Sequence, residues 1–291
     1  STRTSGETRR DDINAGLFLQ ETIGLHDKLF LTAGLRVDGN SPFGNEFSSE
    51  NYPKGSIAYN ISQEGFWPQD LIPTMKLRLA YGESGTAPTQ FAADRTYTPI
   101  SAQDGQPAVT PGNLGNPKLG PEKSQEFEAG FDAGLLQDRI GMEVTAYFER
   151  TKGALLSVPY ASSLGFLSSQ LTNIGEVENR GLEISLNALL VQRPDLEFSA
   201  NTQFTTTHNE VTDLGGLLPF NVTGGRVIKG YPITGQWGYT VKSWDARTRQ
   251  HVRSDTMDYF GQADPKWFGS ISSNLRFHRF RLTGLLEVTG G

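Results

Sequence analysis

The feature of this sequence that most constrains its fold is a period-two alternation of apolar and polar residues in long runs. In Met142–Glu149 every second residue is apolar, which places the apolar side chains on one face of a β-strand. The runs are about 8–12 residues long, whereas strands of soluble proteins average about 5–6 and a tilted bilayer crossing needs about 9–11. Similar runs are Leu29–Asp38, Met75–Gly82, Lys123–Gly134, Leu182–Leu190, Leu196–Thr207, Trp267–Phe277 and Phe280–Thr289.

The connections between these runs alternate in length. Short turns rich in Asp, Pro and basic residues are expected at Leu25–Lys28, Leu136–Arg139, Gln192–Asp195 and His278–Arg279. Long connections are expected at Gly39–Asn51, Gly85–Glu122, Lys152–Gly175 and Asp213–Tyr231. Outer-membrane barrels are wired in this way, whereas a soluble β-sandwich has no reason to sort its loops by length. The pattern therefore favours an all-β, antiparallel, up-and-down transmembrane β-barrel, with Gly85–Glu122 and Lys152–Gly175 at the same rim.

Composition excludes several other classes of protein. The chain has 32 acidic and 26 basic residues, a net charge of −6, which argues against a nucleic-acid partner. It has no cysteine, so disulfide frameworks and thiolate zinc sites are excluded. Its apolar stretches, such as Ala15–Leu19, are far shorter than the ~20 residues of a membrane-spanning helix.

Catalytic signals are weak, and we expect neither an enzyme nor a metal site nor a cofactor. The four histidines, His26, His208, His251 and His278, are scattered and lack the i, i+4 spacing of a helical metal site. No nucleophile elbow and no phosphate-binding Gly-Lys-Ser/Thr loop occurs. Paired carboxylates of the glycosidase type stay open as an alternative, although nothing singles out one pair.

The two faces of the strands have different expected roles. On the polar side Arg78, Glu126, Glu128, Glu143 and Glu183 would line the lumen, and a hydrated ion-pair lining is favoured over a substrate site. The residues expected on the convex, lipid-facing side are Val144, Ala146, Phe148, Leu182, Ile184 and Leu186, opposite Glu143, Thr145, Glu183 and Ser185 on the concave side.

Aromatic residues fall into two groups. Tyr81, Phe127, Phe131 and Phe148 lie in apolar registers near strand ends, where barrels place interfacial girdles. A second group lies in or near the expected long loops, where the rings could stack on sugars or other amphipathic ligands, although loop packing is the favoured interpretation. The weak substrate-binding candidates in this group are Trp67, Tyr97, Tyr160, Trp237 and Trp244.

Six ordered segments resemble barrel signatures of the SusC/RagA family of TonB-dependent outer-membrane receptors. They are Leu35–Gly44, Tyr52–Ser62, Met75–Gly85, Gly115–Glu122, Asn173–Glu183 and Gly261–Ser270. Proline in Asn116–Pro121 would fix the backbone before a strand, and Asn179–Gly181 is expected to form a bend or bulge at the barrel rim.

The resemblance implies TonB-dependent import of oligosaccharides, peptides or other large solutes across the cell outer membrane. The implied partners are a SusD-like surface lipoprotein, the TonB complex acting through a plug domain, outer-membrane lipid, and a glycan or other solute. Such barrels have about 22 strands, so we expect residues 1–291 to form a partial barrel of about 10–12 strands, an open curved sheet lacking the N-terminal plug and the final strands. Its edges would lie near Ala15–Gly24 and Phe280–Thr289.

Two alternatives remain open at this point. The first is a siderophore or cobalamin receptor that shares the barrel. The second is a soluble secreted β-sandwich that binds carbohydrate, which would place its apolar residues inside rather than on an exposed convex face.

Overall fold

The computed structural model describes residues 13–40, 49–159, 161, 163, 165–166, 169–222 and 225–291. The elements described in these ranges are mainly long strands, together with the single-turn 3₁₀ helices η1 (Ile61–Gln63) and η2 (Gln103–Gly105). The main sheet contains β1 (Asn14–Leu25), β2 (Leu29–Asn40), β3 (Glu50–Tyr59), β4 (Thr74–Thr86), β7 (Glu122–Leu135), β8 (Ile140–Val158), β9 (Gln170–Gln192), β10 (Leu196–Asp213), β17 (Trp267–Phe277) and β18 (Phe280–Gly290). Among the described residues, no helix has the length and hydropathy to cross a bilayer.

In the described part of the chain, four two-stranded ribbons lie outside the main sheet. They are β5 (Tyr97–Ser101) with β6 (Pro107–Pro111), β11 (Phe220–Val222) with β12 (Gly225–Val227), β13 (Gly235–Gly238) with β16 (Asp258–Gln262), and β14 (Val241–Asp245) with β15 (Gln250–Arg253). The first belongs to the β4–β7 connection and the other three to the β10–β17 connection. Long connections therefore contain structure of their own.

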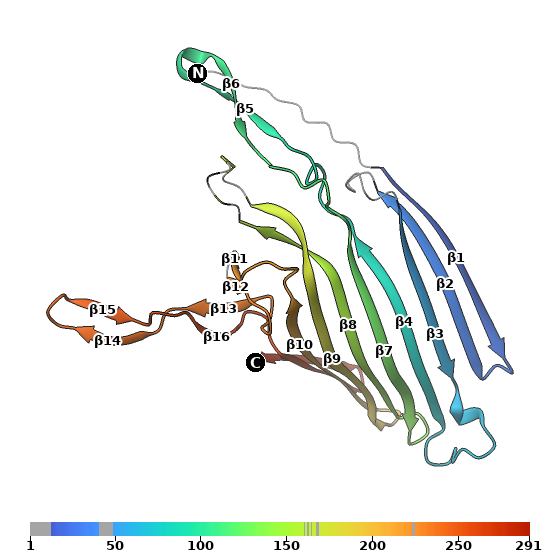
Figure 1. Cartoon of the computed structure of the whole chain (residues 1–291). Helices are drawn as coiled ribbons and strands as arrows, with labels where there is room; N and C mark the ends of the chain where they lie inside the picture. The colour runs from blue at the N-terminus through green and yellow to red at the C-terminus, as the bar shows by residue number, and fades with distance from the viewer. Residues whose placement is uncertain are drawn as a thin grey trace.

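The ten long strands form one antiparallel meander in the order β1-β2-β3-β4-β7-β8-β9-β10-β17-β18. Figure 1 shows a curved sheet that stays open. Strands β1 and β18 are its two edges, and in the described part of the chain each pairs with one neighbour. The predicted fold class, an open partial barrel with these two edges, is confirmed.

The two ends of the sheet carry different connections. One end, the turn rim, carries the β1–β2, β3–β4, β7–β8, β9–β10 and β17–β18 connections, and the opposite end, the loop rim, carries those between β4 and β7, β8 and β9, and β10 and β17 (Figure 1). The predicted common rim of Gly85–Glu122 and Lys152–Gly175 is confirmed. Most of Lys152–Gly175 is nevertheless strand rather than loop, because β8 and β9 continue past their predicted ends.

Non-glycine residues in the left-handed region form the tightest turns. His26 and Asp27 have φ of 53° and 56° between β1 and β2, and His278 has φ of 50° between β17 and β18. The β7–β8 turn has three such residues in succession, Leu136, Gln137 and Asp138. Left-handed turn residues match the right-handed twist of a hairpin, so the predicted short turns are confirmed at these positions.

Strand register separates two faces of the sheet. Val144 lies opposite Ile184 and Ala146 opposite Leu182, whereas Thr145 lies opposite Glu183 on the other side. The predicted sorting of residues into an apolar face and a polar face is therefore confirmed. The apolar face stays open to its surroundings, with Phe148 37% and Leu286 60% exposed, as lipid-facing side chains require.

The main buried cluster lies at the loop rim rather than in the middle of the sheet. Its members are Ala154, Ile174, Val177, Val211, Leu214 and Val227, and four large side chains, Leu119, Ile174, Val211 and Val227, are fully buried. Val177 of β9 lies between Thr151 of β8 and Val211 of β10, in one cross-strand row. Thr151 belongs to the polar face, so the two valines point to that side. The β10–β17 connection therefore packs on the polar side of the wall.

The expected bend or bulge at Asn179–Gly181 is wrong. Strand β9 runs through these residues in continuous register with β8 and β10. Gly181 lies opposite Tyr147, and a Cβ atom at Gly181 would lie 2.7 Å from the Tyr147 hydroxyl and 2.0 Å from the Thr206 carbonyl oxygen. The glycine is needed because the tyrosine and the neighbouring backbone fill the space of a side chain.

Candidate functional site

Four carboxylates gather on the polar face of β7, β8 and β9. Glu126 lies directly opposite Glu149, while Glu128 lies opposite Tyr147 and Glu183 opposite Thr145. In the described part of the chain none of the four forms an ion pair, and Glu149 accepts a hydrogen bond of 3.1 Å from the Asn179 amide. These carboxylates, which lie in three successive cross-strand rows, give the wall a negative potential that attracts cationic groups and repels anionic ones.

Two cations of the neighbouring strand β4 are already engaged. Arg78 Nη2 lies 2.7 Å from Asp132 Oδ1 and donates to Thr145 Oγ1 at 3.2 Å, and Lys76 Nζ lies 3.4 Å from Asp132 Oδ2. These contacts link β4, β7 and β8. Partly exposed pairs of this kind contribute little stability each, so we assign them a role in holding strand positions.

The predicted ion-pair lining is therefore only partly present. Arg78 is paired, but Glu126, Glu128, Glu143 and Glu183 have no cationic partner among the described residues. Glu143 sits across from Asp132 in the row nearer to the turn rim. The prediction paired these groups because they share a face, whereas the strand register places Asp132 next to Lys76 and Arg78 of β4.

Hollows on the polar face offer space for polar groups. One of about 330 Å³ is lined by Lys54, Ser56, Glu126, Glu128 and neighbouring backbone. A larger one of about 890 Å³ lies nearer to the turn rim. Its lining includes amides and hydroxyls of Asn187, Asn201, Ser272, Asn274 and Thr283, together with the charged residues Asp138, Arg139 and Arg281. Amides and hydroxyls of this kind can bind a solute through hydrogen bonds. No group of three metal-ligating side chains occurs in the described ranges.

The candidate aromatic residues of the loops do not form one site. Trp237 packs against Tyr231 and Tyr259 with ring centroids 4.7 and 5.2 Å away, at the base of the β13–β16 ribbon. Trp244 contacts His251 at 4.9 Å on the β14–β15 ribbon. Tyr97 lies 6.4 Å from Phe166 on the β5–β6 side of the loop rim. Tyr160 lies outside the described residues.

Trp67 does not belong with these aromatics. It lies in a long connection, as expected, but this connection joins β3 to β4 at the turn rim rather than at the loop rim. Its indole Nε1 donates to the Ile72 carbonyl at 2.7 Å. This contact closes the connection on itself, a structural role that needs no ligand.

A row of aromatic side chains marks one boundary of the apolar face. Tyr81, Phe127 and Phe148 lie side by side on three adjacent strands. Two residues closer to the loop rim, the same strands carry Glu83, Gln125 and Arg150. A change from aromatic side chains to charged and polar side chains is typical of a membrane–water interface. Phe131 lies deeper in the apolar face, between Leu77 and Val144, so its predicted place in the girdle is wrong.

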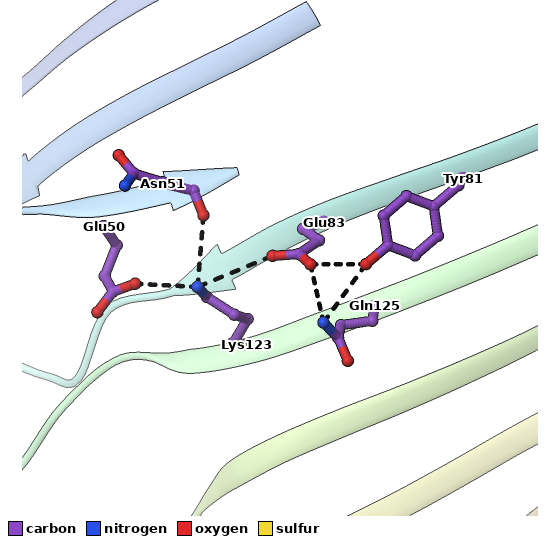
Figure 2. Close-up of polar contacts among 6 residues, drawn as sticks. All are labelled: Glu50, Asn51, Tyr81, Glu83, Lys123 and Gln125. Atoms are coloured by element: carbon purple, nitrogen blue, oxygen red, sulfur yellow. Dashed lines mark hydrogen bonds and ion pairs between the residues drawn. The ribbon is translucent and has the colours of Figure 1, made fainter. Parts of the chain in front are cut away.

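Polar contacts hold the strand ends together just above the aromatic row (Figure 2). The Tyr81 hydroxyl donates to Glu83 at 2.6 Å, and the Gln125 amide donates to the same carboxylate at 2.8 Å. Lys123 Nζ reaches Glu50 at 3.0 Å and Glu83 at 3.8 Å, which links β7 to β3 and β4. We did not predict this network, although the two-residue step from an aromatic to a polar side chain recurs in each strand.

The side chain of Asn173 in β9 forms hydrogen bonds with the segment that precedes β7. Its Oδ1 accepts from Gly120 N at 2.8 Å, and its Nδ2 donates to the carbonyls of Gly120 and Gly153 at 2.9 Å each. Glu122 adds a contact from its carboxylate to Leu155 N at 2.9 Å, while Leu119 is fully buried. These contacts support the structural interpretation of Asn116–Pro121, and they join two of the sequence segments that carry the resemblance.

Comparison with known proteins identifies the relatives of this fold. A family model described as "TonB dependent receptor-like, beta-barrel" matches residues 2–289. TonB-dependent receptor P26 of Formosa agariphila is 32% identical over 70% of this chain and 21% of its own length, and TonB-dependent receptor SusC of Bacteroides thetaiotaomicron is 29% identical over 66% and 20%. A structure of the RagAB peptide transporter superposes with a TM-score of 0.84 at 22% identity, covering 95% of this chain and 33% of that one. The chain thus spans about a fifth of the length of these curated relatives.

Proposed function

Because the chain belongs to the TonB-dependent receptor-like β-barrel family, as the SusC/RagA resemblance predicted, we propose that it forms part of the wall of a receptor for active import. The family is one of outer-membrane proteins. The apolar face of the sheet would therefore contact the lipid of the outer membrane. The solutes we propose are oligosaccharides or other molecules too large for porins. The RagAB relative is a peptide transporter, so peptides are included.

The observation that carries this proposal is the division of the sheet into two faces. An exposed apolar face bounded by an aromatic row suits lipid, and a polar face with hollows and carboxylates suits a hydrated lumen. A soluble carbohydrate-binding sandwich would bury its apolar residues between two sheets. Here the apolar face is uncovered, with Leu17, Leu19 and Leu286 among its exposed residues.

We propose that residues 1–291 supply one part of a barrel that other strands complete. The two unpaired edges support this arrangement, since a membrane barrel has no free edge. A plug domain energised by TonB would fill the lumen, and a SusD-like lipoprotein would cover the loop rim. The receptor's own chemistry would then be binding and release, with no catalytic step.

Uptake by cells that express the full-length receptor tests the proposal. We expect a receptor deletion and a TonB deletion each to abolish uptake of the same oligosaccharide or peptide, with the protein in the outer-membrane fraction. Loss of ferric siderophore or cobalamin uptake alone would favour the metal-chelate receptor instead. Uptake that persists without TonB would contradict active import.

A further inference from the structure

The apolar face of the sheet carries two polar side chains near the loop rim, on β9 and β10. The cross-strand row that contains Phe148 continues with Arg180 of β9 and then with His208 of β10. Both side chains therefore point to the lipid-facing side. Arg180 lies closer to the loop rim than Leu182 on its strand, and His208 closer than Phe204. Arg180 is exposed, and the side chain of His208 is 54% exposed.

Arg180 has no partner of opposite charge in the described part of the chain, although two carboxylates lie in the next row of the same face. Glu178 has its Oε1 atom 2.7 Å from Arg150 Nη2. Glu210 has its Oε2 atom 3.5 Å from His208 Nε2. Each carboxylate is thus close to another basic side chain. The guanidinium group of Arg180 keeps its N–H donors for a ligand.

An apolar groove lies beside these two residues on β10, β17 and β18. It encloses about 300 Å³, and its lining includes Thr202, Phe204, Trp267, Ile271, Leu286 and Val288. Gly269 leaves the groove open, because it lies between Phe204 and Val288 in one cross-strand row and has no side chain. The ring of Trp267, at the end of the groove nearer to the loop rim, has its centroid 6.2 Å from that of Phe204.

The groove and the polar pair are spaced as the two parts of a lipid are. Phe204 and His208 are four residues apart on β10, which corresponds to about 13 Å at about 3.3 Å per residue. The hydrocarbon core of a bilayer is about 30 Å thick, and the headgroup layers bring the total to about 40–45 Å. A headgroup at the level of Arg180 and His208 would therefore place its acyl chains at the level of the groove.

We propose that Arg180, His208 and this groove form a binding site for a phosphate-bearing lipid on the outer surface of the barrel wall. The guanidinium group has the planar fork that matches a phosphate, and the unpaired positive charge selects an anionic headgroup. One acyl chain would lie in the groove over Gly269. The lipid would belong to the outer leaflet, since the long loops of such barrels are extracellular. The inference rests on the proposed function, in which the apolar face contacts the outer membrane.

Lipid binding to the full-length receptor in detergent tests this site. The probe is dioleoyl phosphatidylglycerol, and the comparison lipid is dioleoylglycerol, which has the same acyl chains and no phosphate. Native mass spectrometry counts the bound lipid. We expect Arg180→Gln to raise Kd for the phospholipid roughly 10-fold or more and to leave Kd for dioleoylglycerol unchanged. Lys118→Gln, which removes an exposed charge before β7, should match wild type.

Filling the groove gives a second measurement. Gly269→Leu should weaken binding of both lipids by roughly 10-fold, because the new side chain takes the space of the acyl chain. A Cβ atom at Gly269 would lie 3.7 Å from the Phe204 ring, an ordinary contact, so heat-modifiable migration should stay as in wild type. Ala33→Leu is the matched control. It adds the same bulk at an exposed position of β2 in the row of Gly55 and Tyr81, away from the groove.

The outcomes separate this inference from the proposed function. If Arg180→Gln binds the phospholipid as wild type does, or if wild type binds both lipids equally well, the lipid site is wrong, and TonB-dependent uptake still supports the proposed function. If inorganic phosphate displaces the phospholipid as effectively as more phospholipid does, the site binds a free anion and the lipid site is overturned. If the receptor is absent from the outer-membrane fraction, both fail.

Discussion

Tyr147 and Gly181 form a pair whose fit depends on the absence of one methyl group. The two residues lie opposite each other on β8 and β9, on the polar face where a large ring needs room beside the backbone. The Tyr147 hydroxyl reaches toward the Thr206 carbonyl at 3.5 Å. A sequence can show that a glycine occurs in a strand, but only register shows that a tyrosine faces it, and this is why a bulge was predicted at Gly181.

We expect Gly181→Ala to destabilise the full-length receptor by about 1–3 kcal/mol, the usual cost of overfilling a packed site. The new methyl group would lie 2.0 Å from a backbone oxygen that cannot move alone. Gly141→Ala is the matched control on the same face, because its nearest contact would be at 3.9 Å. The measurement is the temperature at which folded, heat-modifiable migration is lost. Equal effects of the two substitutions would contradict the packing argument.

Glu64 gives a prediction about pH at the turn rim. The Tyr59 hydroxyl at 3.0 Å, followed by the Lys28 ammonium at 3.3 Å, lowers the pKa of the Glu64 carboxyl. A lowered pKa in the folded state stabilises the fold above the unfolded pKa of about 4.3, and this contribution is lost as pH falls through the folded value. Glu64→Gln should therefore lower the unfolding temperature at neutral pH, with the difference from wild type shrinking in acid. A difference that does not change with pH would rule out this linkage.

At the scale of elements, alternation predicts the parts of strands that face lipid better than the parts beyond it. Trp267–Phe277 was predicted with its observed bounds, and the predicted Phe280–Thr289 is one residue short. β8 and β9 continue to Val158 and from Gln170 because their outer ends pack against the β10–β17 connection. There the polar side of the wall packs against apolar residues of the connection instead of facing a hydrated lumen, so the two-residue contrast between lipid and lumen weakens in the sequence.

The candidate site follows the same division. The face occupied by Glu126, Glu128 and Glu183 was predictable, since it depends only on position within a strand. The Arg78–Asp132 contact and the network around Lys123 were not, because they depend on which residues of neighbouring strands become aligned. A slip of one residue would place each side chain on the opposite face.

The buried cluster at the loop rim leads to a prediction for the β10–β17 connection. Ile174 is fully buried against Val211, Leu214 and Val227, and Ile174→Ala should cost about 2–5 kcal/mol of local stability through the cavity it leaves. The segment that packs on this cluster should exchange amide hydrogens faster in residues 225–233. Leu218→Ala, in the same connection but 84% exposed, is the control. Unchanged exchange in Ile174→Ala would show that something else holds the connection.

At the scale of the whole molecule, closure is what the ten-stranded sheet lacks. A barrel removes its unpaired N–H and C=O groups by joining its first and last strands, whereas β1 and β18 are the separate edges of this sheet. The polar face would then be open along its length. In the proposed receptor, further strands on both sides would complete the wall around a solute.

The two edges predict how residues 1–291 behave when expressed alone. In water the chain should aggregate both through the exposed apolar face and through the edges β1 and β18. Detergent covers the apolar face but cannot satisfy the edge hydrogen bonds in an ordered way, so association should persist in detergent. Full-length receptor in the same detergent should be a single species because its edges are closed. Size-exclusion chromatography with light scattering distinguishes these states, and a monodisperse monomer of residues 1–291 would show that the sheet is self-sufficient.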